Sequence, residues 1–148
     1  MKTEYPFKIL IVEDQKASRI TLGRILEKRF KHIFLAEDGL EGLKLFLEEK
    51  PEMVITDIRM PKMDGLKMIK EIKKVQPDTK IIITTAHSDV DYLLESIHLK
   101  IDYFVSKPII SEDIISLIEK TFCTLSQENT IKTQAQQLNH FKSSFQDK

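Results

Sequence analysis

The sequence has little cysteine, no excess of charge of either sign, and no long hydrophobic run. Its single cysteine, Cys123, excludes an internal disulfide framework and a zinc site built from several cysteines. The 23 basic residues balance 23 acidic ones, so the chain has no overall field that would attract DNA or an anionic membrane. Any electrostatic function must therefore come from a local arrangement of charges.

The apolar runs are too short to cross a bilayer. The run at 81–83 is far shorter than the roughly 20 residues that a membrane-spanning helix needs, and residues 1–8 lack the hydrophobic stretch of a signal peptide. We therefore expect a cytoplasmic protein. A length of 148 residues, with 41% hydrophobic and 31% charged residues, is typical of one globular domain with a substantial core.

Short apolar runs alternate five times with longer segments whose apolar residues recur at helical spacing. The runs predict strands over 7–12, 32–36, 53–56, 79–84 and 101–106, and the other segments predict five helices over 17–26, 40–47, 66–75, 90–97 and 114–122. This alternation is typical of α/β proteins. Nearly uninterrupted Ile, Val and Leu in the strands indicates a parallel sheet that is covered by helices on both faces.

The composition changes after Leu125, which divides the chain into a domain over 1–125 and a polar tail over 126–148. The tail is rich in Gln, Ser, Thr and Asn, and its apolar residues Ile131, Leu138 and Phe145 are spaced by seven. This spacing suits the first heptads of a coiled coil that extends the last helix, and the polar filler suits a disordered end equally well. The sequence leaves both alternatives open. A helix here would lead to an output domain, with a homodimer as a natural consequence.

Carboxylates gather at the predicted strand ends. Glu13 and Asp14 follow the first strand and Asp57 follows the third, and in a parallel sheet these ends share one edge, where such sheets bind ligands. Grouped carboxylates repel one another unless a cation lies among them. Mg²⁺ prefers oxygen ligands and accepts carboxylates together with phosphate oxygens. The sequence therefore predicts a Mg²⁺ site, with Mn²⁺ as an alternative, that the backbone carbonyl of Arg59 completes.

A lysine and a hydroxyl follow the other strands at the same edge. Lys107 can pair with an anion beside Asp57, and Thr85 can donate a hydrogen bond to it. A nucleophile, a bridging cation, a lysine and a hydroxyl donor are the parts needed for phosphoryl transfer to a carboxylate. Asp57, alone at the centre of the sheet, is the predicted nucleophile.

Four motifs follow one another along the chain, at 9–14, 54–65, 85–86 and 107–108. Because of these motifs and their order, residues 7–125 resemble the receiver domains of two-component response regulators. The resemblance implies a flavodoxin-like, doubly wound, five-stranded parallel sheet of order 2-1-3-4-5 with five flanking helices. It also implies that Asp57 accepts a phosphoryl group from the phosphohistidine of a sensor histidine kinase or from a phosphotransfer protein. Glu13 and Asp14 then hold Mg²⁺, and Lys107 contacts the phosphoryl group.

The resemblance further implies a switch in which Thr85 moves toward the phosphoryl group while an aromatic residue swings inward. That aromatic is Phe104, where tyrosine is common, and Lys100 stands where many members have glycine. A left-handed backbone would cost lysine about 1 kcal/mol, so we expect a different turn there. We expect Arg59 and His87 to modulate dephosphorylation; the alternative is that both are solvated loop residues without a kinetic role.

The function that the sequence predicts is a phosphorylation-activated signalling switch. It is not a metabolic enzyme, although it catalyses its own phosphorylation and dephosphorylation, and it controls a partner or output domain through the face of the fourth helix, fifth strand and fifth helix. No direct binding of nucleic acid or membrane is expected. Two rivals are an aspartyl phosphatase, which would need a carboxylate in place of Arg59, and a receiver-like module that never turns over phosphate.

Overall fold

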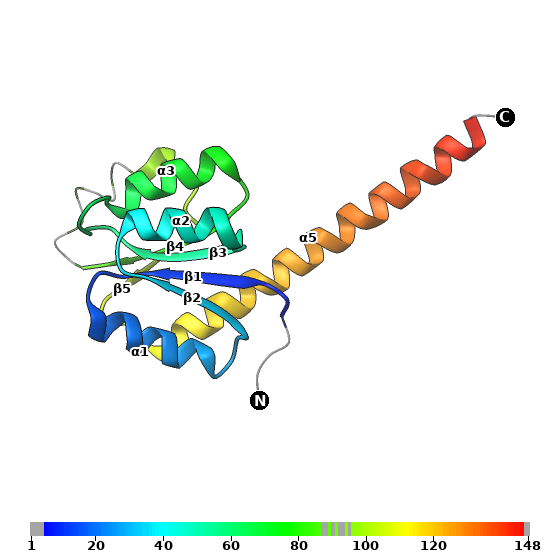
Figure 1. Cartoon of the computed structure of the whole chain (residues 1–148). Helices are drawn as coiled ribbons and strands as arrows, with labels where there is room; N and C mark the ends of the chain where they lie inside the picture. Colours follow the sequence, from blue (N-terminus) through cyan, green and yellow to red (C-terminus); the bar gives the residue numbers. More distant parts are fainter. Residues whose placement is uncertain (1–4, 87–88, 90, 92–93, 95, 147–148) are drawn as a thin grey trace. The chain divides into compact units, whose positions relative to one another are not determined.

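The computed structural model describes residues 5–86, 89, 91, 94 and 96–146 (Figure 1). The chain divides into two compact units, Met1–Ile115 and Ser116–Lys148, and the boundary falls inside the last helix. None of the helices in the described ranges combines the length and the apolar character needed to cross a membrane.

The first unit contains a five-stranded parallel sheet of order β2-β1-β3-β4-β5, which confirms the predicted order. The strands are β1 (Lys8–Val12), β2 (His32–Ala36), β3 (Met53–Asp57), β4 (Lys80–Thr85) and β5 (Tyr103–Ser106). Thr56 pairs with Val12 of β1, and Asp57 pairs with Thr84 of β4. This register brings the carboxyl ends of the three central strands to one edge.

The α-helices of the described residues are α1 (Lys16–Glu27), α2 (Gly39–Glu49), α3 (Gly65–Val75) and α5 (Ser111–Gln146), with a short 3₁₀ helix, η2 (Ser96–His98). Helices α2 and α3 cover one face of the sheet and α1 lies on the other (Figure 1). The sequence predicted five α-helices, and the structure describes four. The predicted helix over 90–97 falls largely outside the described residues; within it Asp91 and Leu94 are helical and η2 begins at Ser96.

The strands are hydrophobic because both of their faces are covered. One core cluster contains strand residues Leu10, Val12, Val54, Ile81 and Ile83 together with Phe46, Met68, Ile69 and Ile72 from α2 and α3. Complete burial of one such side chain contributes about 1.5–3 kcal/mol to folding. This packing fixes the strand ends on which the polar edge depends.

Two local details concern the start of α3 and the turn before β5. Asp64 caps α3, because its Oδ1 accepts a hydrogen bond from the Lys67 backbone amide at 2.8 Å. Left-handed backbone occurs at Lys50 and Lys62 among the described non-glycine residues, and not at Lys100. The turn before β5 therefore avoids the strained conformation, as expected.

The described part of the second unit, residues 116–146, is helical. Helix α5 continues to Gln146, so the part of the tail that the structure describes adopts the helical alternative. Three of its apolar side chains, Ile131, Leu138 and Phe141, are more than half exposed. The division of the chain at 125 remains a prediction; by compactness the boundary falls between Ile115 and Ser116.

Candidate functional site

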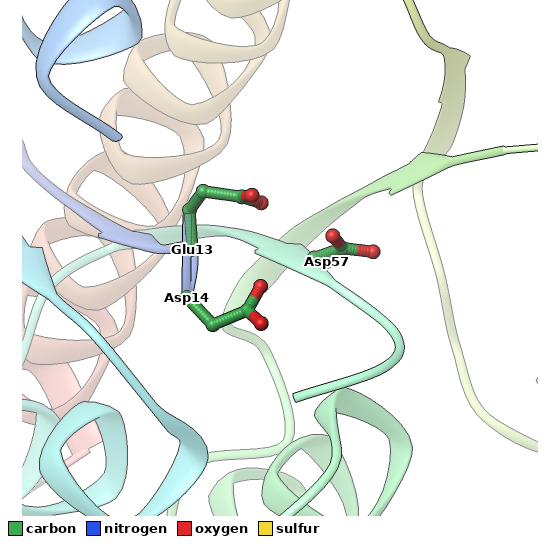
Figure 2. Close-up of side chains that lie close together, drawn as sticks. All are labelled: Glu13, Asp14 and Asp57. Atoms are coloured by element: carbon green, nitrogen blue, oxygen red, sulfur yellow. The ribbon is translucent and has the colours of Figure 1, made fainter. Parts of the chain in front are cut away.

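Three carboxylates lie together at the carboxyl ends of β1 and β3. Figure 2 shows Glu13 and Asp14 just beyond β1 and Asp57 at the end of the neighbouring strand. One carboxylate oxygen of each residue lies within 4.8 Å of the others. Since Val12 and Thr56 are paired across the strands, the next residues along both strands are necessarily neighbours. Glu13 is buried, Asp57 is half-buried and Asp14 is exposed.

Lys107 reaches this group from the loop after β5. Its Nζ lies 2.7 Å from Asp57 Oδ2 and 3.3 Å from Glu13 Oε2. The Lys107 backbone amide donates to the Thr85 carbonyl at 2.8 Å, which holds the start of the loop against the end of β4. The structure thus brings together Glu13, Asp14, Asp57 and Lys107, which the sequence placed at one edge.

Burial and charge shift the ionisation of the site. Burial raises the pKa of Glu13, the negative charge of Asp57 raises it further, and Lys107 only partly opposes this. For Lys107, burial lowers the pKa, but the hydrogen bond and charge of Asp57, together with Glu13, outweigh it and raise the pKa above its ordinary value. Lys107 is therefore a permanent cation at neutral pH.

The donor set fits a divalent cation. Glu13 Oε1 is buried and has no hydrogen-bond partner among the described residues, and leaving a buried carboxylate oxygen unpaired is costly. Three carboxylates and one lysine carry a formal charge of −2, which a divalent ion balances. Hard carboxylate oxygens at this spacing are the ligands that Mg²⁺ prefers. The Arg59 carbonyl remains a predicted further ligand.

The Asp57 carboxylate is held in a defined position. Its Oδ1 accepts from the Ile58 backbone amide at 2.7 Å, while Oδ2 pairs with Lys107. Gly65 packs against the Asp57 backbone, because a Cβ at position 65 would overlap the Asp57 carbonyl oxygen. The Gly65 amide also donates to the Ile58 carbonyl at 2.7 Å. Glycine is required here because α3 approaches the end of β3 so closely.

The predicted switch and modulating residues lie around this centre. Thr85 is buried at the end of β4, one residue beyond the partner of Asp57, and Phe104 in β5 is 49% exposed. Arg59 forms an ion pair with Asp89, with Nε 3.1 Å from Oδ1. His87 lies outside the described residues.

Two nearby residues escaped the sequence-based reasoning. Arg19 of α1 donates from Nη1 to the Glu13 carbonyl at 2.9 Å and so ties α1 to the acidic segment. Asp89, in the loop after β4, forms the ion pair with Arg59. No spacing pattern signals either contact, because each depends on how a side chain turns after folding.

A second acidic group lies at the end of β2. Oxygens of Glu37, Asp38 and Glu41 also lie within 4.8 Å of one another. Asp38, however, caps α2, with Oδ1 accepting from the Glu41 amide at 2.8 Å, and its Oδ2 lies 3.5 Å from Lys62 Nζ. Its oxygens already have structural partners.

Comparison with known proteins identifies the family. The response regulator receiver domain family matches residues 9–119, and the chain belongs to this family. It is 34% identical over 113 residues to sporulation initiation phosphotransferase F of Bacillus subtilis strain 168, covering 76% of this chain and 91% of that protein.

Two further relatives extend the comparison. The structure of a response regulator receiver domain protein from Clostridium thermocellum matches with a TM-score of 0.76 at 28% identity, over 82% of this chain and 98% of that one. The uncharacterized transcriptional regulatory protein YesN of B. subtilis strain 168 is 28% identical over 137 residues, 90% of this chain. Our chain spans only 37% of YesN's length. Family membership makes the protein a signalling domain of two-component systems.

Proposed function

We propose that the protein is a switch activated by phosphorylation of Asp57, with a sensor histidine kinase or a phosphotransfer protein as donor. The observation that carries this proposal is the Asp57 carboxylate itself, which is fixed by the Ile58 amide and Lys107 within a group of carboxylates that suits a divalent ion. A half-buried carboxylate with a defined orientation and a cation beside it suits nucleophilic attack on phosphorus.

In the proposed transfer, an Asp57 oxygen attacks phosphorus as the bond from phosphorus to the donor imidazole nitrogen breaks. The electron pair of that bond leaves with the nitrogen, and an acyl phosphate forms on Asp57. Lys107 stabilises the charge on the phosphoryl oxygens. Mg²⁺ or Mn²⁺, held by Glu13, Asp14, Asp57 and the Arg59 carbonyl, would neutralise charge between the carboxylates and the phosphoryl group. Attack of water on phosphorus later restores the carboxylate and releases inorganic phosphate.

The output of the switch is proposed to be a shift between conformations. Phosphorylation changes the charge at Asp57 from about −1 to about −2, and this change biases an existing equilibrium. Thr85 then moves toward the phosphoryl group and Phe104, half-exposed in the described state, turns inward. The predicted partner face, formed by the segment 90–97, β5 and α5, stays a prediction because much of that segment lies outside the described residues.

The target that the switch controls is either a separate protein or a further domain of a longer chain. Both arrangements occur among the relatives: the chain spans 91% of the phosphotransferase but 37% of YesN. Exposed Ile131, Leu138 and Phe141 on α5 support a homodimer through a coiled coil, which sedimentation of the chain at increasing concentration would test. The cytoplasmic location and the absence of direct nucleic-acid or membrane binding remain predictions.

The proposal is tested by phosphorylation with a small donor. Incubation with Mg²⁺ and acetyl phosphate should add the mass of one phosphoryl group to the wild type and to the control Glu37→Gln, but not to Asp57→Asn. The adduct should be stable in acid and labile in base, as an acyl phosphate is. A wild type that binds Mg²⁺ yet forms no adduct would instead support the receiver-like module that never turns over phosphate. The aspartyl phosphatase is disfavoured because Arg59 is an ion-pair partner, not an acid.

A further inference from the structure

The side chain of Asp89 joins the loop that follows β3 to the loop that follows β4. Its Oδ1 lies 3.1 Å from Arg59 Nε, and its Oδ2 accepts a hydrogen bond from the Ala86 backbone amide at 2.9 Å. The Asp89 side chain is only 5% exposed, whereas that of Arg59 is 55% exposed. A buried carboxylate thus uses both of its oxygens on different loops.

The hydrogen bond from the Ala86 amide does not require a charged acceptor at position 89. The Ala86 amide lies three residues before Asp89, and a neutral asparagine here could accept from it as well, as the uncharged glutamine of a capping box does. Burying a carboxylate is costly unless a cation and hydrogen bonds compensate. The negative charge is therefore explained by the contact with Arg59, whose side chain is 55% exposed.

Both loops begin at residues of the proposed switch. Arg59 follows Asp57 by two residues, and Ala86 follows Thr85 directly. Asp57 and Thr84 are paired across β3 and β4, so the two loops leave the sheet side by side. A phosphoryl group on Asp57 brings a second anion next to the same loops, where it offers Arg59 an alternative partner.

We propose that Asp89 is an internal anion that holds Arg59 and the Ala86 amide in the unphosphorylated form and competes for them with a phosphoryl group on Asp57. This inference rests on the proposed function and names a residue that regulates it. Asp89 is a positioning residue: it acts through the two loops and touches no reacting atom. A ligand shifts an equilibrium only by its different affinity for the two forms, and by reciprocity any change that weakens the Asp89 contacts strengthens the binding of a phosphoryl analogue.

The test measures the affinity of the full chain for trifluoroberyllate, a tetrahedral phosphoryl analogue that attaches to a carboxylate oxygen, at constant Mg²⁺. Asp89→Asn keeps an oxygen for the Ala86 amide and removes the charge. We expect its affinity to rise by about fivefold or more, within the usual range of coupling between sites. A merely structural role for Asp89 would leave the affinity unchanged or lower it.

Asp102→Asn is the matched control. Asp102 Oδ2 accepts a hydrogen bond from the Ile81 amide at 2.7 Å. Asp102 is thus also a carboxylate that accepts a backbone hydrogen bond near β4, but at the opposite end of the strand from Thr85. The affinity of the Asp102→Asn variant for trifluoroberyllate should equal that of the wild type. In an Arg59→Gln background, Asp89→Asn should have no further effect, because the ion pair is already broken.

The outcomes separate the two proposals. If the wild type binds trifluoroberyllate but folded Asp89→Asn binds no more tightly, or if the effects of the two substitutions simply add, the role of Asp89 is overturned and the switch survives. If the wild type does not bind at all, both fail. If Asp89→Asn does not fold, NMR of the ¹⁵N-labelled wild type provides the test. The signals of Arg59 Nε and of the Ala86 amide should shift when trifluoroberyllate binds, and unchanged signals would overturn the inference.

Discussion

The two acidic groups at the carboxyl edge of the sheet have nearly the same composition and very different surroundings. Glu13, Asp14 and Asp57 come from two strands that are far apart in the sequence, and Lys107 lies beside them at 28% exposure. The second group, Glu37, Asp38 and Glu41, comes from a single turn, and the side chain of its lysine, Lys62, is 63% exposed.

The difference lies in what the oxygens already do. In the second group Asp38 is occupied with capping α2 and pairing with Lys62. In the first group Glu13 Oε1 is buried without a partner within the described part of the chain, so the fold leaves an oxygen for a ligand. Closeness of carboxylates alone therefore does not indicate a metal site; an oxygen that the structure leaves unused does.

The largest expected effect distinguishes the two lysines. Lys107→Ala removes a cation 2.7 Å from Asp57 that we propose stabilises the transferring phosphoryl group. The rate of phosphorylation by acetyl phosphate should fall by about 100-fold or more, the usual loss when one such stabilising group is removed. Lys62→Ala removes an exposed lysine from the other group and should change the rate little, because exposed ion pairs contribute little. Rates from intact mass would check this, and equal losses in the two variants would contradict the assignment.

A smaller effect is expected for metal affinity. Asp14→Asn removes an exposed carboxylate that we propose as a ligand, without disturbing the core, and the affinity for Mg²⁺ should fall by at least about tenfold. Glu41→Gln makes the same chemical change in the second group and should leave Mg²⁺ affinity unaltered. Titration calorimetry with Mg²⁺ measures both. If Glu41→Gln weakens Mg²⁺ binding as much as Asp14→Asn does, Mg²⁺ does not bind preferentially to the group of Glu13, Asp14 and Asp57.

The sequence predicted the sheet and the grouping at its edge because both follow from local patterns. Apolar runs determine the strands, and parallel pairing brings their ends together whatever the side chains do. Strand β5 starts at Tyr103, later than predicted. The Ile81 amide donates to the Asp102 side chain, whereas in a continued strand pair it would donate to a backbone carbonyl.

Contacts made by long side chains could not be predicted in the same way. The ion pair of Arg59 with Asp89 and the hydrogen bond from Arg19 to the Glu13 carbonyl depend on rotamers chosen after the loops have met. The helical state of residues 126–146 was also undecided, because its apolar residues are few and its polar residues suit both a helix and a coil.

The smallest expected effect is a difference in pH dependence without metal. Burial and the charge of Asp57 raise the pKa of Glu13 in the folded chain above the ordinary 4.5, so between these two values the folded state binds more protons than the unfolded state. The free energy of unfolding should therefore decrease as the pH rises from 4.5 through the raised pKa. Glu13→Gln should remove this decrease, and Glu41→Gln, in the group whose buried carboxylate Asp38 has structural partners, should keep it.

Urea unfolding in the presence of a chelator, at a series of pH values above 4.5, measures the difference. Saturating Mg²⁺ should also flatten the wild-type profile, because an ion bound to the folded state favours the charged carboxylate and lowers its pKa. If Glu13→Gln and the wild type lose stability in parallel as the pH rises, then Glu13 is not the carboxylate whose charged form the fold disfavours. The contrast between the two acidic groups would then have to rest on Lys107 alone.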